Sequence, residues 1–309
     1  MSGKENEAGM AKQIRGSLLL MLAAFIWGVA FVAQSVGMEY VGPFTFISVR
    51  FLLGSAVLLP VIAAGWKRAS KRAENKEQTN GKELILGGLC CGTALFVASS
   101  LQQIGISHTT VGKAGFITAL YIIFVPLFGI FFRRIPGIRV WIAVMMSALG
   151  LYLLCMKGSF QLSLGDTYVF CCAVAFSIHI LLVDYFSGRV DPIWLSCLQF
   201  FVCGIAAAVP MLLLEAPRLS ALWEAAVPIL YAGILSSGVA FTLQVVAQKD
   251  TNPTAASLIM SLESVFSVLA GWVLLGQKLS WREGLGCILM FSAMILAQLP
   301  GGKKVRDSQ

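Results

Sequence analysis

Charged residues are scarce in this chain. Lys, Arg, Asp and Glu make up 12% of its 309 residues, whereas hydrophobic residues make up 58% and form long stretches such as LLLMLAAFIWGVAFVA. Mean hydropathy is +0.82. A soluble domain would interrupt such stretches with charge or alternate them with polar residues. The composition therefore excludes a soluble domain and indicates an integral membrane protein.

Sequence motifs of membrane enzymes and pumps are also absent. The chain has no HExxH zinc motif, no paired Asp-rich motif, no GxSG-like serine motif inside a hydrophobic stretch and no P-loop. Its eight cysteines all lie in hydrophobic stretches, without metal-ligand spacing to His108 or His179. We therefore expect no enzyme activity, no catalytic residue, no cofactor and no metal site.

Ten hydrophobic stretches have the length of roughly 20 residues that a helix needs to cross a bilayer. They are apolar on every face, whereas the strands of a membrane β-barrel alternate. The sequence therefore predicts an all-α integral membrane protein with ten transmembrane helices. The predicted spans are residues 17–38, 43–65, 84–106, 112–132, 138–156, 164–186, 193–214, 226–247, 253–275 and 282–299.

The two halves of the chain resemble each other. At an offset of 149 residues the matching pairs are Gly16 and Gly165, Trp27 and Phe176, Pro43 and Pro192, and Phe51 and Phe200. After a small gap, TTVGKAGFI (109–117) matches TNPTAASLI (251–259). Because five spans is an odd number, tandem copies enter the membrane from opposite sides. The sequence predicts two inverted five-helix repeats, residues 17–156 and 164–299.

Positive charge is unevenly distributed over the predicted loops. With a cytoplasmic N-terminus, 17 of the 23 Lys and Arg residues lie on the cytoplasmic side and 5 outside, and Arg50 lies within a span. The positive-inside rule therefore predicts cytoplasmic tails at both ends, residues 1–16 and 300–309. This orientation explains the net charge of +8 without nucleic acid as a partner.

Several spans resemble EamA-type transporters of the drug/metabolite transporter (DMT) superfamily. The similar stretches are AAFIWGVAFVAQSVG, FISVRFLLGSAVLL, AGFITALYIIFVPLFG and SLESVFSVLAGWVLLGQKLSWREGLGCILMFSAMIL. The resemblance implies ten helices around a central cavity, a multi-pass location in the bacterial plasma (inner) membrane, and a small-molecule substrate. It also implies export of small metabolites, amino acids or drug-like compounds.

The chain departs from the family pattern in span 253–275. Family members frequently carry Glu-Pro there, but this chain has Glu263 followed by Ser264. Because proline kinks a helix, its absence predicts that this span lacks the kink.

Glu263 lies near the middle of its span. An ionised carboxylate facing lipid there would cost about 2.5 to 3.5 kcal/mol even on the lenient insertion scale. The side chain must therefore face the bundle, be paired or be protonated. Two hypotheses stay open: Glu263 binds a proton or a cationic part of a substrate, or it is a neutral acid that bonds to a neighbouring helix.

Arg50 also lies too deep in its span for easy snorkelling, so it needs an acceptor. It could pair with Glu263, clamp a substrate carboxylate or anchor helix-end carbonyl groups. His179 and Asp184, at near-helical spacing, could relay protons or lie at the membrane interface.

Other side chains are suited to an amphipathic small molecule. Trp27 and Tyr121 supply aromatic surface away from the interfaces, and Gln244 is one of several uncharged polar residues within spans. The candidate substrate- or proton-binding residues are Glu263, Arg50, Trp27, Tyr121, His179 and Gln244.

These features together predict a secondary active transporter that works by alternating access, as an exporter, with proton coupling as a further expectation. The two halves would rock about a site lined by the first, second, fourth, sixth and ninth spans. A channel would show a repeated polar filter or a charge ring, which this sequence lacks. The alternatives are a regulatory or structural membrane protein, and an importer or exchanger of the same fold. A monomer and a homodimer are both compatible with the sequence.

Overall fold

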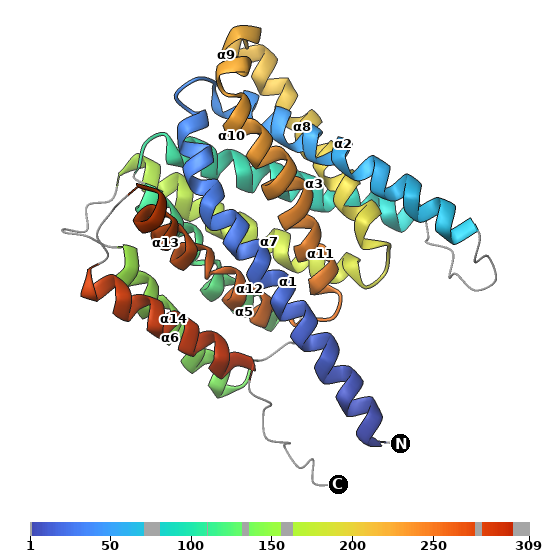
Figure 1. Cartoon of the computed structure of the whole chain (residues 1–309), viewed down its shortest axis with the longest axis vertical. Helices are drawn as coiled ribbons and strands as arrows, with labels where there is room; N and C mark the ends of the chain where they lie inside the picture. Colours follow the sequence, from blue (N-terminus) through green and yellow to red (C-terminus); the bar gives the residue numbers. More distant parts are fainter. Residues whose placement is uncertain are drawn as a thin grey trace.

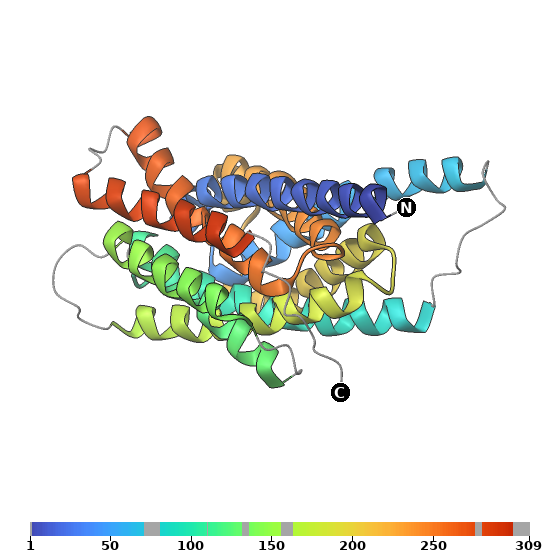
Figure 2. The ribbon, with the colours of Figure 1, turned by 90° about the horizontal axis from the view of Figure 1, so that it is seen from below.

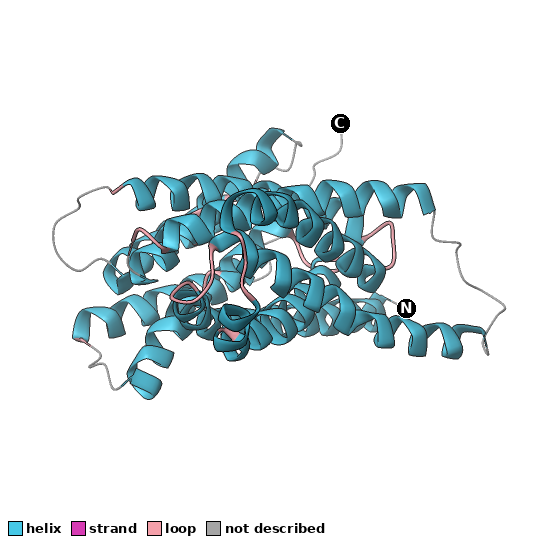
Figure 3. Cartoon of the chain, turned by 90° about the horizontal axis from the view of Figure 1, so that it is seen from above, coloured by secondary structure: helices cyan, strands magenta, loops and turns pink. Residues whose placement is uncertain are grey.

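The computed structural model describes residues 2–70, 81–109, 111–131, 136–155, 163–275 and 280–298. Within these ranges the chain is a bundle of helices without strands (Figure 3). Its outer surface is strongly apolar, and Leu213 and Ile138, for example, are 77% and 74% exposed. Side chains of this kind are stable on the outside of a bundle when lipid surrounds it, which confirms the prediction of an all-α membrane protein.

The helices follow the predicted spans closely. In the first half they are α1 (Ser2–Gly37), α2 (Pro43–Ser70), α3 (Gly81–Ile106), α4 (Val111–Thr118), α5 (Tyr121–Phe131) and α6 (Ile138–Cys155). In the second half they are α7 (Leu164–Ser187), α8 (Pro192–Pro210), the π-helix η1 (Met211–Glu215), α9 (Leu219–Glu224), α10 (Ala226–Leu230), the π-helix η2 (Tyr231–Phe241), α11 (Thr242–Gln248), α12 (Pro253–Met260), α13 (Glu263–Leu275) and α14 (Trp281–Gln298).

These helices make up ten spans, because α4–α5, α8–η1, α10–η2–α11 and α12–α13 each form one span. In the described part of the chain, eight of these spans are long and apolar enough to cross a membrane. The other two are α6, with a shorter apolar stretch at Ile138–Leu153, and the 18-residue α14. These two lie side by side at one edge of the bundle (Figure 1). The structure therefore has the two sets of five helices that the sequence predicts.

Polar residues before the hydrophobic stretches determine where several helices begin. The side chain of Asp191 accepts hydrogen bonds from the backbone N–H groups of Ile193 and Trp194, at 2.9 and 3.2 Å, at the start of α8. Ser163 and Asp166 form a capping box at the start of α7. Such caps satisfy backbone donors that the first helical turn leaves unpaired, so these helix starts were readable from the sequence.

Packing between the helices follows the internal repeat. α3 packs along α7 and α8, and η2, its counterpart in the second half, packs along α1 and α2. α2 also packs on its own counterpart α8, and α6 packs on α14. At the contact of α2 with α8, the rings of Phe51 and Phe200 have their centroids 5.9 Å apart. These two residues are 149 positions apart, so the approximate two-fold axis of the repeat passes close to them.

Two spans are interrupted at equivalent points. α4 ends at Thr118 and α5 begins at Tyr121, while α12 ends at Met260 and α13 begins at Glu263. At the first break the N–H of Leu120 bonds to the carbonyl of Ile117, three residues back, at 3.2 Å. At the second, Leu262 bonds in the same way to Ile259, at 3.1 Å. Both breaks are therefore tight 3₁₀-type turns.

The span that carries Ser264 in place of the family's proline is nevertheless interrupted. The break at residues 261–262 needs no proline, because a switch from i−4 to i−3 hydrogen bonds interrupts the helix instead. The Ser261 hydroxyl stabilises the turn by donating to the carbonyl of Leu258 at 2.8 Å. The hydroxyl of Ser264 donates to the carbonyl of Gly115 in α4, at 3.2 Å, and so ties one interrupted span to the other.

Candidate functional site

A central cavity of about 50 Å³ lies between the two halves. Figure 2 shows α1 along one side of the bundle and α3 along the other. A cavity of this size has room for about four water molecules, at roughly 10 to 15 Å³ each. Its lining residues are Trp27, Phe31, Gln34, Arg50, Gln102, Thr118, Tyr121, Phe176, Ile180, Ser236, Phe241, Gln244, Met260 and Glu263.

The structure brings five of the six candidate residues together in this lining. They are Glu263, Arg50, Trp27, Tyr121 and Gln244. The lining includes the five spans expected from the sequence and two more, the third (α3) and the eighth (η2 and α11). Both halves of the chain therefore build one site.

His179 is the candidate that lies outside the lining. It is fully buried, and its ring stands edge-on to Phe176 and Phe241, whose rings do line the cavity, with centroids 6.4 and 6.1 Å away. Its Nε2 atom lies 3.0 Å from Oε1 of Gln199. His179 thus supports the cavity wall from behind, and its hydrogen-bond partner is Gln199 rather than Asp184.

Glu263 and Tyr121 meet where the two interrupted spans cross. The Tyr121 hydroxyl donates to Oε1 of Glu263 at 3.1 Å, and both side chains are buried. Each is the first residue of its half-helix, and they lie 142 positions apart, the same offset that matches 109–117 with 251–259. Glu263 also lies in the first turn of α13, where the helix dipole favours negative charge. The hydrogen bond therefore joins equivalent points of the two repeats.

Arg50 lines the cavity from α2 and is 2% exposed. It makes no hydrogen bond or ion pair with any other described residue, Glu263 included. Its guanidinium carbon instead lies 4.6 Å from the ring centroid of Phe51 and 5.7 Å from that of Phe46. Cation–π contact replaces only part of the hydration that a buried guanidinium loses.

Trp27 connects α1 with the π-helix η2. Its indole N–H donates to the carbonyl of Ser236 at 3.3 Å, and its ring packs 4.7 Å from that of Phe241. A π-helical stretch widens the backbone and is frequent at functional sites. Here it directs one carbonyl toward the cavity side of the helix.

Several lining residues were not among the sequence candidates. Phe31 and Ile180 are 149 positions apart, and Thr118 and Met260 are 142 apart. Trp27 matches Phe176 and Tyr121 matches Glu263 at the same two offsets. Both further pairs lie one helical turn from these residues, on the same face, so the alignment of the two halves could have identified them. Ser236 enters the lining through the π-helix, which no sequence signal predicts.

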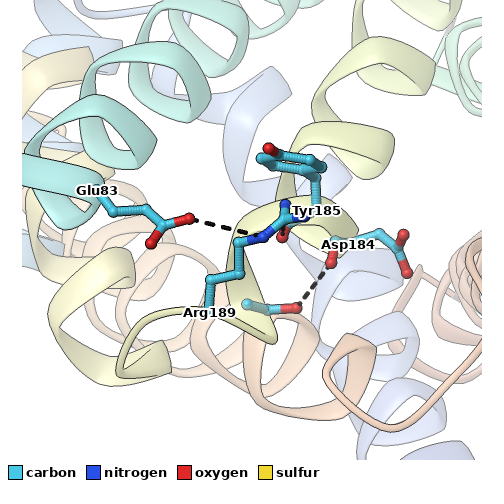
Figure 4. Close-up of polar contacts among 5 residues, drawn as sticks. Glu83, Asp184, Tyr185 and Arg189 are labelled. Atoms are coloured by element: carbon cyan, nitrogen blue, oxygen red, sulfur yellow. Dashed lines mark hydrogen bonds and ion pairs between the residues drawn. The ribbon is translucent and has the colours of Figure 1, made fainter. Parts of the chain in front are cut away.

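A second hollow of about 740 Å³ opens on the surface of α5 and α7. Its lining is mainly apolar, including Phe131, which is 83% exposed. At its rim, Nε of Arg189 lies 3.6 Å from Oε1 of Glu83, and the guanidinium stacks 3.4 Å from the Tyr185 ring centroid (Figure 4). Because this hollow opens on the outer surface of the bundle and takes its lining mainly from one edge of it, the central cavity, which both halves line, is the better candidate for a solute. Among the described residues, no group of three or more His, Cys, Asp or Glu side chains gathers to hold a metal.

The fold and the central cavity define a multi-pass membrane transporter of the DMT type, with a small-molecule substrate. A sequence model of the EamA-like transporter family matches residues 14–156 and 163–298, one match for each half. The chain therefore belongs to the EamA-like transporter family.

Individual relatives agree with this assignment. An uncharacterized transporter of Archaeoglobus fulgidus is 26% identical over 289 residues, which cover 93% of this chain and 87% of that protein. The uncharacterized transporter YoaV of Bacillus subtilis is 21% identical over 285 residues, covering 90% and 94%. A protein crystal structure superimposes with a TM-score of 0.74 at 20% identity, covering 92% of this chain and 96% of that one. It supports the fold.

Proposed function

We propose that this protein is a secondary active transporter that exports small metabolites, amino acids or drug-like compounds across the bacterial plasma (inner) membrane by alternating access. The observation that carries the proposal is the buried Glu263 carboxylate, hydrogen-bonded to Tyr121 where interrupted helices from the two repeats meet at the cavity. Discontinuous helices that meet near the membrane centre are typical of carriers built from inverted repeats.

Packing between the halves supports a rocking motion. The contacts of α3 with α7 and of η2 with α1 are equivalent and join one half to the other. In an inverted repeat, such equivalent contacts lie toward opposite faces of the membrane. Loosening one set while tightening the other would open the cavity to each side in turn.

Glu263 is positioned to couple this motion to a proton or to cargo. Among the described residues, the Tyr121 hydroxyl donates to its carboxylate, and apart from Arg50 the rest of the lining is apolar or carries uncharged polar groups. A proton or a cationic substrate group would compete with that hydroxyl for the carboxylate oxygens. Since Tyr121 and Glu263 belong to different halves, the competition would change the contact between the halves, which is how binding can shift a two-state equilibrium.

The proposal includes orientation and assembly. The distribution of Lys and Arg supports cytoplasmic termini. All the residues of the cavity come from one chain, so a monomer contains a whole site, and a homodimer would have two.

The proposal is tested by comparing metabolites in the spent medium of cells that express the wild-type chain, Glu263→Gln, Glu224→Gln or an empty vector, at matched membrane levels. Glu224 is exposed on α9, away from the cavity, and is the matched control. We expect a compound enriched outside with wild type and Glu224→Gln, and at least about tenfold less with Glu263→Gln.

Equal enrichment with Glu263→Gln would show that this carboxylate is structural. No enrichment with any variant would contradict export. Proteoliposome uptake of the enriched compound, with and without a pH gradient, tests proton coupling, and identical rates would argue against it.

A further inference from the structure

Three polar groups in the lining of the central cavity lack hydrogen-bond partners among the described residues, and they are of opposite kinds. One is the guanidinium of Arg50, whose Nε has no hydrogen-bond acceptor among the described residues. The others are the amide oxygens of Gln34 and Gln244, which are buried without a donor. Buried polar groups are nearly always hydrogen-bonded, so unsatisfied ones that line a cavity indicate a ligand that completes them.

The orientation of the Gln244 amide follows from a chain of hydrogen bonds. The carbonyl of Ile180 can only accept, so the amide nitrogen of Gln248 must face it, at 3.1 Å. Oε1 of Gln248 then faces Gln244 and accepts from Nε2 of Gln244 at 2.9 Å. Because the network leaves no other assignment, Oε1 of Gln244 is the unpaired atom. Gln248 therefore makes Gln244 an acceptor toward the cavity.

The equivalent residues of the first half have a different arrangement. Gln102, 142 positions before Gln244, uses its Nε2 atom to donate to the hydroxyl of Thr118, at 3.4 Å. Ile106 stands where the second half has Gln248, so no side chain there can fix an amide. An acceptor that a neighbouring amide holds in place is thus found in the second half, whereas the guanidinium of Arg50 and the unpaired amide oxygen of Gln34 come from the first.

Charge in the cavity adds a third constraint. Arg50 and Glu263 both line it but do not pair with each other. A ligand with only an anionic group would satisfy Arg50 but would leave Gln244 without a donor and Glu263 with the Tyr121 hydroxyl as its donor. A ligand with only a cationic group would leave Arg50 unpaired. A ligand that carries both groups satisfies all three and keeps the cavity neutral.

We propose that the central cavity is selective for small zwitterions, with Arg50 binding a carboxylate, Gln244 and Glu263 accepting from an ammonium group, and Gln248 acting as the positioning residue for Gln244. This inference rests on the proposed transport function, because it assigns the substrate class of the same site. The rings of Trp27, Phe176 and Phe241 form the apolar wall on which the rest of the zwitterion packs.

Probes that differ only in their charged groups test this proposal on the purified full chain in lipid nanodiscs. Phenylalanine carries both groups, phenethylamine the amine alone and 3-phenylpropanoate the carboxylate alone. Alanine, ethylamine and propanoate repeat the comparison at a smaller size. Binding is measured by calorimetry for wild type, Arg50→Gln and Gln248→Ile. Gln248→Ile introduces the residue of the first half, and the thermal midpoint of each variant checks that it folds.

We expect the zwitterion of at least one series to bind wild type at least tenfold more tightly than either of its partial analogues. Arg50→Gln should remove the advantage of the zwitterion over the amine. Gln248→Ile should weaken the zwitterion at least fivefold but change binding of the carboxylate probe less than twofold, a difference that general loss of packing would not produce.

A partial analogue that binds as tightly as its zwitterion, or no binding in either series, would overturn the inference. If that happens while Glu263→Gln still abolishes export, the substrate class is wrong and the transport function stands. If zwitterions bind as expected but proteoliposomes do not take them up, the transport function fails and the recognition chemistry stands.

Discussion

The two halves of this chain share an arrangement of helices but differ in the side chains that they place at equivalent positions. Phe31 and Ile180, or Gln102 and Gln244, occupy equivalent places in the cavity lining with similar side chains. Tyr121 and Glu263 are equally equivalent, yet one donates the hydrogen bond that the other accepts. Arg50 in the first half corresponds to Gln199, which bonds to His179 behind the cavity wall.

In the proposed mechanism, this difference separates the helix arrangement that moves from the side chains that bind the solute. Inverted repeats can adopt two equivalent conformations, each open to one side of the membrane. Different charges at equivalent positions would give the solute a fixed orientation between the two halves. Four comparisons between equivalent positions test this distinction, and they follow in order of decreasing expected effect.

The largest effect is expected at the contact of α1 with α13. A Cβ atom at Gly28 would lie 2.7 Å from Cβ of Phe266 and 2.8 Å from the carbonyl oxygen of Glu263, whereas the equivalent position in the second half holds Ser177. Gly28→Val should lower the free energy of unfolding by about 3 kcal/mol, the upper range for overpacking. Thermal denaturation in detergent measures the change.

Gly115→Ala is the matched control for Gly28→Val. A Cβ atom there would have a single neighbour within 4 Å, the Ser264 hydroxyl at 3.9 Å, so we expect an unchanged midpoint. A Gly28→Val protein as stable as Gly115→Ala would show that α1 and α13 do not need this close approach.

The next effect concerns the hydrogen bond between equivalent residues. A double-mutant cycle of Tyr121→Phe and Glu263→Gln should show a coupling of about 1.5 to 3 kcal/mol, the range for a hydrogen bond to a charged group. Transport rates in proteoliposomes give the energies. Strictly additive losses would mean that the two halves do not communicate through this bond.

A smaller effect is expected at the starts of α2 and α8, which are capped differently. Asp191 caps α8 from its own chain segment, but Gly42, 149 positions earlier, has no side chain. Glu215 caps α2 instead, accepting from the backbone N–H groups of Phe44 and Thr45 at 2.8 and 2.7 Å.

Glu215→Ala should therefore cost about 1 to 2 kcal/mol, the upper range for loss of a cap. Gly42→Asp added to Glu215→Ala should recover part of this loss by giving α2 the kind of cap that α8 has. The thermal midpoints of the single and double variants measure how much stability Gly42→Asp restores. If Gly42→Asp destabilises the Glu215→Ala protein further, the start of α2 cannot be capped in the way that α8 is.

The smallest effect is expected for Glu83→Gln. The ion pair of Glu83 with Arg189 is partly exposed at both partners, and the equivalent positions, Tyr40 and Ala225, carry no charge. Partly exposed pairs contribute about 0 to 1 kcal/mol and are screened by salt. The midpoint should change by less than about 2 °C at low ionic strength and not at all in molar salt. A larger shift that persists in salt would show that this ion pair stabilises the contact between the two halves.

Hydropathy predicted the fold well because the bilayer imposes length and polarity on each span. α7 and α12, for instance, begin where Ser163 and Asn252 supply caps that the sequence shows. The breaks after Thr118 and Met260 could not be predicted, because a change in hydrogen-bond spacing leaves composition unchanged. Their depth within predicted spans made Glu263 and Arg50 candidate site residues, and both line the central cavity. Whether they pair depends on how the helices are rotated, which hydropathy does not encode.

The small volume of the central cavity has a consequence for the cell as well as for the substrate. About four waters in single file span roughly a third of the 30 Å hydrocarbon thickness. The waters in this cavity therefore cannot form a continuous wire for protons from one face of the membrane to the other. For the proposed carrier, this means that the cavity in this conformation does not by itself short-circuit the proton gradient across its membrane.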